Sequence, residues 1–347
     1  MRPILRLSKR LASRVIATAT FARLVSLLER ADDPRPNLLR ILTYHRVDEP
    51  QAHPERYPGL ISAAPRDFEQ QMSFLATHYH VVSMQDLLDV VQKGAVLPPR
   101  AVLITFDDAY DDFAEYAWPV LKRYHLPVTL FVPTAFPDHP EHVFWWDRLH
   151  EALSSASERA SIDTPLGSLP VGTAAQRKQS YTRLRHYLKG LPHATAMASI
   201  TQICDDLGVT GPRQTVLGWD ALRQLASEGV TMGAHTRTHP LLNRVSPDAV
   251  RAEVVGSLDD LKRELGAPPP IFAYPSGGFD DQVVQILKQE GIVLAFTTVS
   301  GVNNLGNADP LRLRRINIGS RTTFALFRAR LLPWTMVFDH RLPAVRS

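Results

Sequence analysis

The chain has 347 residues, of which 44% are hydrophobic and 21% charged, so disordered, collagen-like and coiled-coil classes are excluded and one large barrel is permitted. Its single cysteine, Cys204, excludes an internal disulfide framework and a zinc site built from cysteines. The net charge of +4 arises in the first thirty residues, which hold seven basic residues and one acidic residue; the remainder, with 32 basic and 34 acidic residues, has no basic excess that would favour nucleic-acid binding.

Residues 1–36 are predicted to form a basic amphipathic helix that ends near Asp32-Asp33-Pro34. Two roles are open for it: docking on the rest of the protein, or peripheral contact of residues 1–30 with an anionic membrane surface. Residues 15–22 form too short an apolar run for a typical secretion signal, and no stretch resembles a spanning helix. We therefore expect a cytoplasmic protein, with or without peripheral membrane attachment.

Residues 37–347 repeat a short apolar run followed by a helical pattern. The apolar runs are 39–43, 79–82, 101–106, 128–132, 230–233, 271–273, 293–297 and 315–318. The helical patterns are 65–77, 84–93, 113–124, 221–228, 247–265 and 280–290. Strands that alternate with helices in this way predict an α/β barrel with parallel strands.

One segment, at about 137–215, interrupts this repeat. It contains helical patterns at 147–155 and 175–188, a loop pattern at 162–172 and no strand pattern. We predict a helical insertion on the loop face of the barrel, where long segments contact substrate or act as lids. The aromatic residues Phe144-Trp145-Trp146 at its start are expected to pack the insertion onto the barrel rather than stack on a sugar.

Polar residues follow four of the apolar runs. They are Tyr44-His45, Asp107-Asp108, His235 with His239, and Tyr274-Pro275-Ser276-Gly277. In an α/β barrel the carboxyl ends of the strands meet on one face, where catalytic groups collect. We therefore expect these four clusters to converge.

The two histidines have the spacing of metal ligands. His239 precedes Pro240, which disfavours a helix, so the pair is placed on a strand end and turn. Two imidazoles and one carboxylate would complete a three-ligand site for a zinc-like ion with one open position. The alternative is that both rings bond to backbone groups; the neighbouring carboxylate pair favours a metal.

The adjacent carboxylates of Asp107 and Asp108 raise each other's pKa unless a cation lies between them. A division of roles resolves this conflict, with one carboxylate as a metal ligand and the other as a general base toward water. Asp111 and Asp112, just beyond, fit a capping or solvated role.

At this point the sequence resembles a known family. Residues 105–108 resemble the TFDD motif, and residues 235–239 the H-[ST]-x-x-H motif, of the polysaccharide deacetylases (NodB homology, carbohydrate esterase family 4). Residues 229–239 and 272–277 resemble flanking parts of the same family. The resemblance covers residues 39–318 and implies a distorted (β/α)7-type barrel that removes acetyl groups from N-acetylated sugars with the help of a metal.

The resemblance also implies roles for individual residues. Asp107 becomes the base, and Asp108, His235 and His239 the ligands of a divalent metal, with zinc as first choice and cobalt or nickel also accepted. Residues 274–277 (Tyr274, Pro275, Ser276 and Gly277) become the substrate or oxyanion segment, with the Ser276 backbone N–H as the donor.

The sequence departs from the family pattern in two places. Ala273 and Ser276 flank Pro275 where the family has an arginine and a tyrosine, so Arg314, Arg315 or no residue replaces that arginine. No Leu-x-His motif follows the last strand. In some members an early Tyr-His replaces it, so His45 is predicted to be the general acid, against the alternative of a buried ring bonded to backbone.

Taken together, these residues predict a metal-dependent N-deacetylase that acts on an N-acetylhexosamine-containing polysaccharide or glycolipid and releases acetate. The missing arginine and tyrosine support one alternative, a catalytically weak or inactive member of the same fold that binds glycans or scaffolds polysaccharide assembly.

Overall fold

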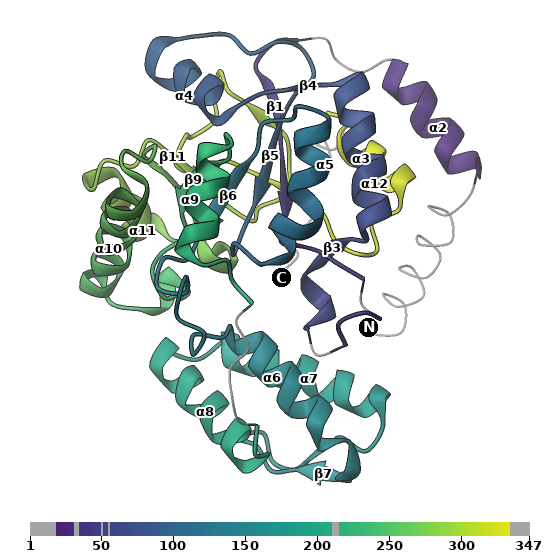
Figure 1. Cartoon of the computed structure of the whole chain (residues 1–347), viewed down its shortest axis with the longest axis vertical. Helices are drawn as coiled ribbons and strands as arrows, with labels where there is room; N and C mark the ends of the chain where they lie inside the picture. The colour runs from purple at the N-terminus through teal and green to yellow at the C-terminus, as the bar shows by residue number, and fades with distance from the viewer. Residues whose placement is uncertain (1–18, 31–34, 50, 55, 210–214, 334–347) are drawn as a thin grey trace.

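The computed structural model describes residues 19–30, 35–49, 51–54, 56–209 and 215–333. Its centre is a curled sheet with strand order β11-β10-β9-β6-β5-β1-β12, in which β13 also pairs with β1 and β4 with β5 (Figure 1). The bounds are β1 (Leu38–Tyr44), β4 (His80–Val81), β5 (Ala101–Phe106), β6 (Thr129–Val132), β9 (Thr231–Ala234), β10 (Ile271–Ala273), β11 (Leu294–Phe296), β12 (Asn303–Asn304) and β13 (Ile316–Asn317).

Along the sheet, the neighbouring strands β1, β5, β6, β9, β10 and β11 run parallel to one another, as the alternation of strands and helices predicts. β1 and β5 pair from Leu39 opposite Ala101 to Tyr44 opposite Phe106, and every residue of both strands is buried. Such nearly continuous apolar strands are typical of a parallel sheet that is covered on both faces.

The barrel is closed by residues 313–317. Leu313 forms a parallel bridge to Phe296 of β11, and β13 pairs in parallel with Leu42 and Thr43 of β1. This segment therefore joins the two edges of the sheet and confirms the (β/α)7-type barrel. The eighth predicted strand, at 315–318, is this closing strand.

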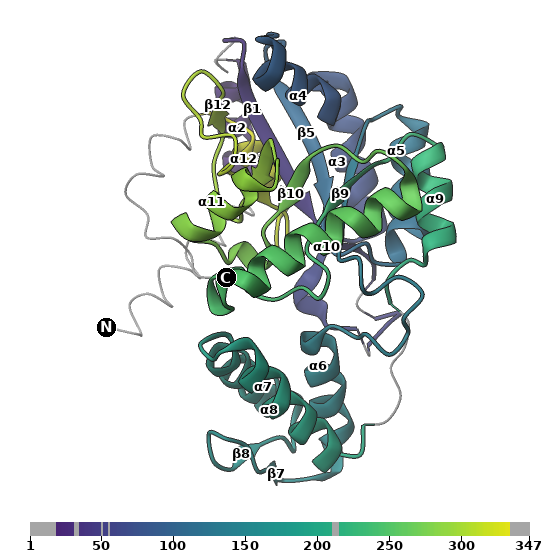
Figure 2. The same ribbon diagram turned by 90° about the vertical axis from the view of Figure 1, so that its left-hand side faces the viewer.

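Helices cover the outer face of the barrel (Figures 1 and 2). They are α3 (Pro65–His78), α4 (Met84–Lys93), α5 (Trp118–Arg123), α9 (Trp219–Ser227), α10 (Pro247–Leu265) and α11 (Asp281–Gln289). The helix predicted at 113–124 is split into a π-helical turn, η2 (Phe113–Ala117), followed by α5. Pro119 has no N–H to donate to the carbonyl of Glu115, which favours the wider turn.

The insertion forms a separate lobe at the mouth of the barrel (Figure 1). It contains α6 (Trp145–Ser155), α7 (Ala174–Lys189), α8 (His193–Asp206), the turn η3 (Ala156–Glu158) and a short hairpin of β7 (Ser161–Ile162) and β8 (Leu169–Pro170). The prediction of no strand is thus wrong for this hairpin, and α8 was not predicted. α8 buries small and branched side chains, Ala196, Ile200 and Cys204 among them, between polar residues, and this weakens its apolar pattern.

Of the predicted N-terminal helix, the structure describes α2 (Ala19–Arg30); residues 1–18 lie outside the described residues. Val25 packs against Ala329 and Leu332 in and after α12 (Phe324–Arg330), and Arg328 forms an ion pair with Glu29. This part of the helix therefore docks on the barrel. Within the described ranges, no helix has the length and apolarity needed to cross a bilayer, and membrane contact of residues 1–30 stays a prediction.

Candidate active site

Asp108, His235 and His239 come together at the carboxyl ends of β5 and β9. The Asp108 Oδ1 atom lies 3.4 Å from His235 Nε2 and 3.3 Å from His239 Nε2. All three side chains are buried, and one ligand atom from each lies within 4.8 Å of the others. In the part of the chain that the structure describes, this is the only such group of histidine, cysteine and acidic side chains.

The chemistry of this group, which we call the metal cluster, fits a divalent ion. Asp108 Oδ1 is buried and accepts no hydrogen bond from a described residue, which is costly for a carboxylate without a cation. His235 Nδ1 lies 2.7 Å from the Ala273 carbonyl oxygen and donates to it, so in the neutral ring Nε2 carries the lone pair that a metal ion needs. An N, N, O donor set of this kind suits zinc with an open coordination position.

The backbone at the site is strained. Asp108, Thr236, His239 and Ser276 have φ angles of 73°, 65°, 59° and 49°, in the left-handed region that disfavours residues other than glycine. Each such residue costs about 1–3 kcal/mol, and such residues cluster at functional sites. The prediction that Pro240 keeps His239 out of a helix is confirmed.

The loop between the two histidines is held by α10. Glu253 Oε2 accepts the backbone N–H groups of Arg237 and Thr238 at 2.7 and 2.9 Å, and Oε1 accepts the Thr238 hydroxyl at 2.5 Å. Arg237 Nε also donates to Asp260 Oδ2 at 2.9 Å. The sequence analysis did not identify Glu253; its only signal is a carboxylate in the helix that follows the histidine loop.

Asp107 forms a bidentate pair with Arg315 of the closing segment. Arg315 Nη1 donates to Oδ1 at 2.8 Å and Nη2 to Oδ2 at 2.7 Å, while Nε donates to the Thr297 carbonyl. Burial by itself would raise the pKa of Asp107, but the charges of Arg315 and His235 hold it below its ordinary value. Arg315, rather than Arg314, therefore stands in for the missing arginine and keeps Asp107 ionised and oriented.

His45 reaches the same site from the end of β1. Its Nε2 lies 4.0 Å from Asp108 Oδ2, and its side chain is 25% exposed. Its backbone N–H donates to the Ser62 hydroxyl, which joins it to β3 (Ile61–Ala63), the partner of β2 (Arg46–Val47). The ring is therefore partly open to solvent beside the metal cluster, unlike the fully buried ring of the alternative interpretation.

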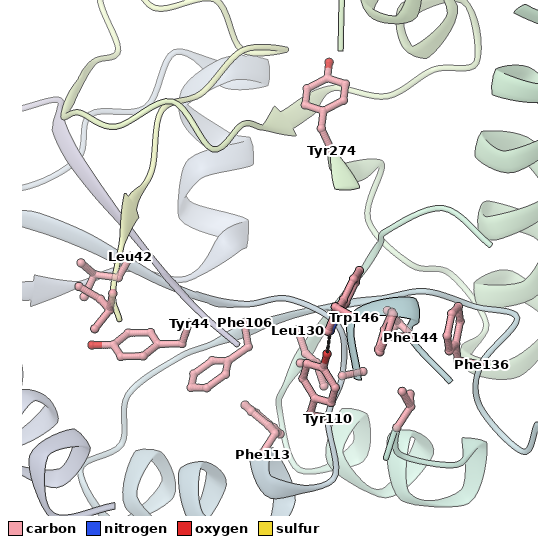
Figure 3. Close-up of a cluster of buried hydrophobic side chains, with 14 of the residues drawn as sticks. Leu42, Tyr44, Phe106, Tyr110, Phe113, Leu130, Phe136, Phe144, Trp146 and Tyr274 are labelled. Atoms are coloured by element: carbon pink, nitrogen blue, oxygen red, sulfur yellow. Dashed lines mark hydrogen bonds between the residues drawn. The ribbon is translucent and has the colours of Figure 1, made fainter. Parts of the chain in front are cut away.

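The segment 274–277 contributes less than the resemblance implies. Tyr274 is buried and its hydroxyl donates to the Leu311 carbonyl, and Figure 3 shows its ring pointing away from Phe144 and Trp146. Its side chain is thus a core residue, which corrects the predicted substrate role. The N–H groups of Tyr274 and Gly277 donate to the carbonyls of Phe296 and Tyr274, and Pro275 has none. Of the four residues, only Ser276 can offer an oxyanion donor.

A second buried group, which we call the support cluster, consists of Arg46, Asp112 and Asp147. Arg46 Nη1 lies 3.0 Å from Asp112 Oδ2 and Nη2 lies 3.5 Å from Asp147 Oδ2. The guanidinium carbon of Arg46 is 3.6 Å from the centre of the Tyr110 ring. The predicted capping or solvated role of Asp112 is wrong, because the fully buried side chain pairs with Arg46.

Aromatic residues connect the support cluster to the metal cluster. Trp146 Nε1 donates to the Tyr110 hydroxyl at 2.9 Å, and the rings of Phe136, Phe144 and Trp146 stack in a row (Figure 3). The Phe144 and Trp146 rings meet His239 edge to face, at 5.4 and 5.0 Å between ring centres. The predicted packing role of Phe144 and Trp146 is confirmed, and it includes contact with a predicted metal ligand.

The chain matches a family model, that of the polysaccharide deacetylases, over residues 95–161 and 170–295. It is 22% identical over 287 residues to the poly-beta-1,6-N-acetyl-D-glucosamine N-deacetylase of Escherichia coli strain K12, a match that covers 81% of this chain and 37% of that protein. It is 29% identical over 123 residues to the enzyme of that name from Staphylococcus aureus, a match that covers 31% of this chain and 42% of that protein. The matched segments therefore cover less than half the length of either relative.

Solved structures share the fold. Deacetylase PplD of Streptococcus pyogenes, in complex with acetate, superposes with a TM-score of 0.58 at 21% identity and covers 86% of this chain and 100% of its own. A de-N-acetylase from Aggregatibacter actinomycetemcomitans superposes with a TM-score of 0.57 at 18% identity, over 84% of this chain and 99% of its own. With a family model matched over more than half its length, the chain belongs to the polysaccharide deacetylase family of hydrolases.

Proposed function

We propose that the chain is a metal-dependent N-deacetylase that hydrolyses acetamido groups of an N-acetylhexosamine-containing polysaccharide or glycolipid and releases acetate. One observation carries the proposal: the Asp107–Arg315 pair lies directly beside the metal cluster. An oriented carboxylate beside three side chains that could hold a metal ion supports metal-assisted hydrolysis.

Asp108, His235 and His239 would hold the ion, with zinc as first choice and cobalt or nickel as substitutes. When bound, such an ion supplies a Lewis acid and lowers the pKa of water at the site. Asp107 accepts a proton from the attacking water, and Arg315 holds the carboxylate in place for that transfer.

Water attack forms a C–O bond at the acetyl carbonyl carbon, and the C–N bond then breaks to give acetate and a free amine. The Ser276 N–H donates to the oxygen on which negative charge develops. His45 donates a proton to the departing nitrogen, because an amide nitrogen leaves readily only when it is protonated.

The inactive-scaffold alternative rested on the missing arginine and the missing tyrosine, and the arginine now has a substitute. Arg315, just before β13 in the closing segment, directs its guanidinium at Asp107, so the carboxylate has the partner that a working base needs. We therefore propose an active deacetylase rather than an inactive scaffold.

Acetate release tests the proposed function directly. The purified chain, loaded with zinc, is incubated with N-acetylglucosamine oligomers and N-acetylglucosamine glycolipids, and acetate is measured with and without a chelator. We expect release that chelation abolishes and added zinc restores, together with about one zinc per chain by elemental analysis. Absence of acetate from every substrate by fully zinc-loaded protein would contradict the proposal.

His45→Ala tests the general acid. The variant should keep its zinc and turn over about 10²–10⁴-fold more slowly, because no ring remains to donate a proton to the departing nitrogen. His186→Ala, an exposed histidine of α7, is the matched control and should behave as wild type. Unchanged turnover in zinc-loaded His45→Ala would show that another group is the acid.

A further inference from the structure

The first turn of α6, in the insertion, reaches into the barrel. Asp147 of the support cluster lies in this turn and is buried, although the insertion as a whole forms a separate lobe (Figure 1). Its Oδ1 atom accepts the Tyr57 backbone N–H at 3.1 Å, and its Oδ2 atom lies 3.5 Å from Arg46 Nη2. The Tyr110 hydroxyl donates to Oδ2 at 3.4 Å. One carboxylate of the insertion therefore holds three segments that lie outside the insertion.

Two of these segments carry residues of the proposed active site. Arg46 directly follows His45, the proposed general acid. Tyr110 lies two residues after Asp108, a predicted metal ligand. His45 Nε2 lies 4.0 Å from Asp108 Oδ2, beyond hydrogen-bond distance, so the position of the ring depends on the backbone that carries it. The ion pair of Arg46 with Asp147 therefore acts on the backbone one residue from the proposed acid.

The Arg46 side chain is fully buried and is held from two sides. Nη1 lies 3.0 Å from Asp112 Oδ2, on the barrel, and Nη2 faces Asp147. Among the described residues Nη2 has no hydrogen-bond partner, so Asp147 holds it by charge. Burial raises the pKa of Asp147, and the charge of Arg46 opposes this rise. Without the charge of Asp147, we expect the guanidinium to turn toward Asp112, because a buried charge is costly without a partner.

We propose that Asp147 is a positioning residue: through Arg46, it holds the backbone at His45 so that the imidazole meets the departing nitrogen. The inference rests on the proposed deacetylase function, in which His45 is the general acid, and adds a residue of the insertion to it. The proton still passes from His45 to the nitrogen, and Asp147 neither gives nor takes one. Such a role matters because a misplacement of about 1 Å can slow a reaction about 100-fold.

Asp147→Asn tests the role in turnover, because the amide keeps the shape and the acceptor for the Tyr57 N–H but removes the charge that faces Arg46. Zinc-loaded full-length protein is assayed for acetate release from an N-acetylglucosamine oligomer. We expect kcat to fall about 10–100-fold, KM to stay within about twofold and the zinc content to stay that of wild type. Asp205→Asn, an exposed aspartate of α8, is the matched control and should change none of these.

The His45→Ala background separates positioning from stability. If Asp147 acts through His45, Asp147→Asn should lower kcat by less than about twofold once His45 is replaced. An equal fall in both backgrounds would show that Asp147 acts through the fold as a whole and would overturn the proposal. A rise in KM at unchanged kcat would also overturn it, because Asp147 would then belong to substrate binding.

A measurement without substrate tests the same link. In ¹³C–¹H spectra of zinc-loaded full-length protein that contains ¹³C-labelled histidine, the His45 signal is identified by its loss in His45→Ala. Asp147→Asn should move or broaden this signal and leave those of the exposed His78 and His186 in place. An unmoved His45 signal would overturn the proposal. Acetate from no substrate would overturn the proposed function, whereas a moved signal would still show that Asp147 holds the ring.

Arg46→Lys tests the link from its other end and covers the case in which Asp147→Asn does not fold. Lysine keeps a positive charge beside Asp112 but lacks the second nitrogen that faces Asp147. The variant should lower kcat and move the His45 signal as Asp147→Asn does. Wild-type turnover together with an unmoved signal would contradict the proposal.

Discussion

The metal cluster and the support cluster are two buried, charged groups at one end of the same barrel. They differ in how many hydrogen bonds their carboxylate oxygens accept. Asp112 Oδ1 accepts the Val47 N–H at 2.9 Å, and Asp147 Oδ1 accepts the Tyr57 N–H at 3.1 Å. Asp108 Oδ1 has no hydrogen-bond partner among the described residues.

This difference separates a ligand site from a structural one. A buried carboxylate that already has a guanidinium and a backbone N–H has little capacity for a further ligand, and its loss would leave the guanidinium buried without its partner. A buried carboxylate between two imidazole nitrogens at 3.3 and 3.4 Å has a vacant acceptor that a cation would fill. Loss of a side chain should therefore affect metal binding in one cluster and stability in the other.

The largest expected effect is at a metal ligand. His239→Ala should abolish zinc binding and acetate release while the far-ultraviolet circular dichroism stays that of the folded protein, because two ligands do not replace three. Zinc content after gel filtration is the measurement, and exposed His78→Ala is the control. Full zinc occupancy in His239→Ala would remove this residue from the metal cluster.

The next largest effect is at Asp107, beside the metal cluster. Asp107→Asn should retain zinc and lower kcat by about 10²–10⁴-fold, because the amide preserves the shape but cannot accept the proton. Asp108→Asn is the matched comparison and should lose zinc. If both variants lost zinc equally, the two carboxylates would share the ligand role.

A change in the support cluster should act on stability. Asp112→Ala leaves the Arg46 guanidinium buried without its closest carboxylate, which costs about 3–5 kcal/mol of unfolding free energy. Urea unfolding of the zinc-free protein measures this cost. Asp205→Ala, an exposed aspartate of α8, is the control and should cost less than about 1 kcal/mol. If the two variants lowered the free energy of unfolding equally, the support cluster would have no special role in stability.

The smallest effect concerns the support of the histidine loop. Glu253→Ala should weaken zinc binding about 10–100-fold, because the backbone N–H groups of Arg237 and Thr238 lose the carboxylate that holds the loop. Competition with a chelating dye measures the affinity. Asp259→Ala, exposed on the same helix, should match wild type. Unchanged affinity in Glu253→Ala would mean that the strained loop keeps its geometry without α10.

The barrel and the metal cluster were predictable from the sequence because both depend on local patterns. Apolar runs of strand length locate β5 and β9, and the polar residues directly after them must emerge on one face. The choice between Arg314 and Arg315 was not predictable, because adjacent residues point to opposite sides of a strand and a shift of one position exchanges them. Only the pairing of the closing segment with β1 and β11 decides it.

The support cluster was missed for a related reason. Asp111 and Asp112 are neighbours with the same side chain, so the sequence does not show which of them is buried. In the structure Asp112, directly before the π-helical turn that begins at Phe113, points inward to Arg46. That turn depends on tertiary packing and on Pro119 rather than on the two aspartates. The Tyr274 side chain was likewise misplaced, because a motif identifies a segment but not the direction in which each side chain points.

The closing segment also sets the order in which the site is completed during synthesis. Asp107 and Arg315 are separated by 208 residues, which a ribosome adds in about 10–40 s at about 5–20 residues per second. His235 and His239 emerge before that interval ends, so the residues of the metal cluster precede the partner of Asp107. A nascent chain can therefore bring Asp108, His235 and His239 together while Asp107 still lacks its guanidinium, and the pair proposed to act as the base is complete only after residues 313–317 have left the ribosome.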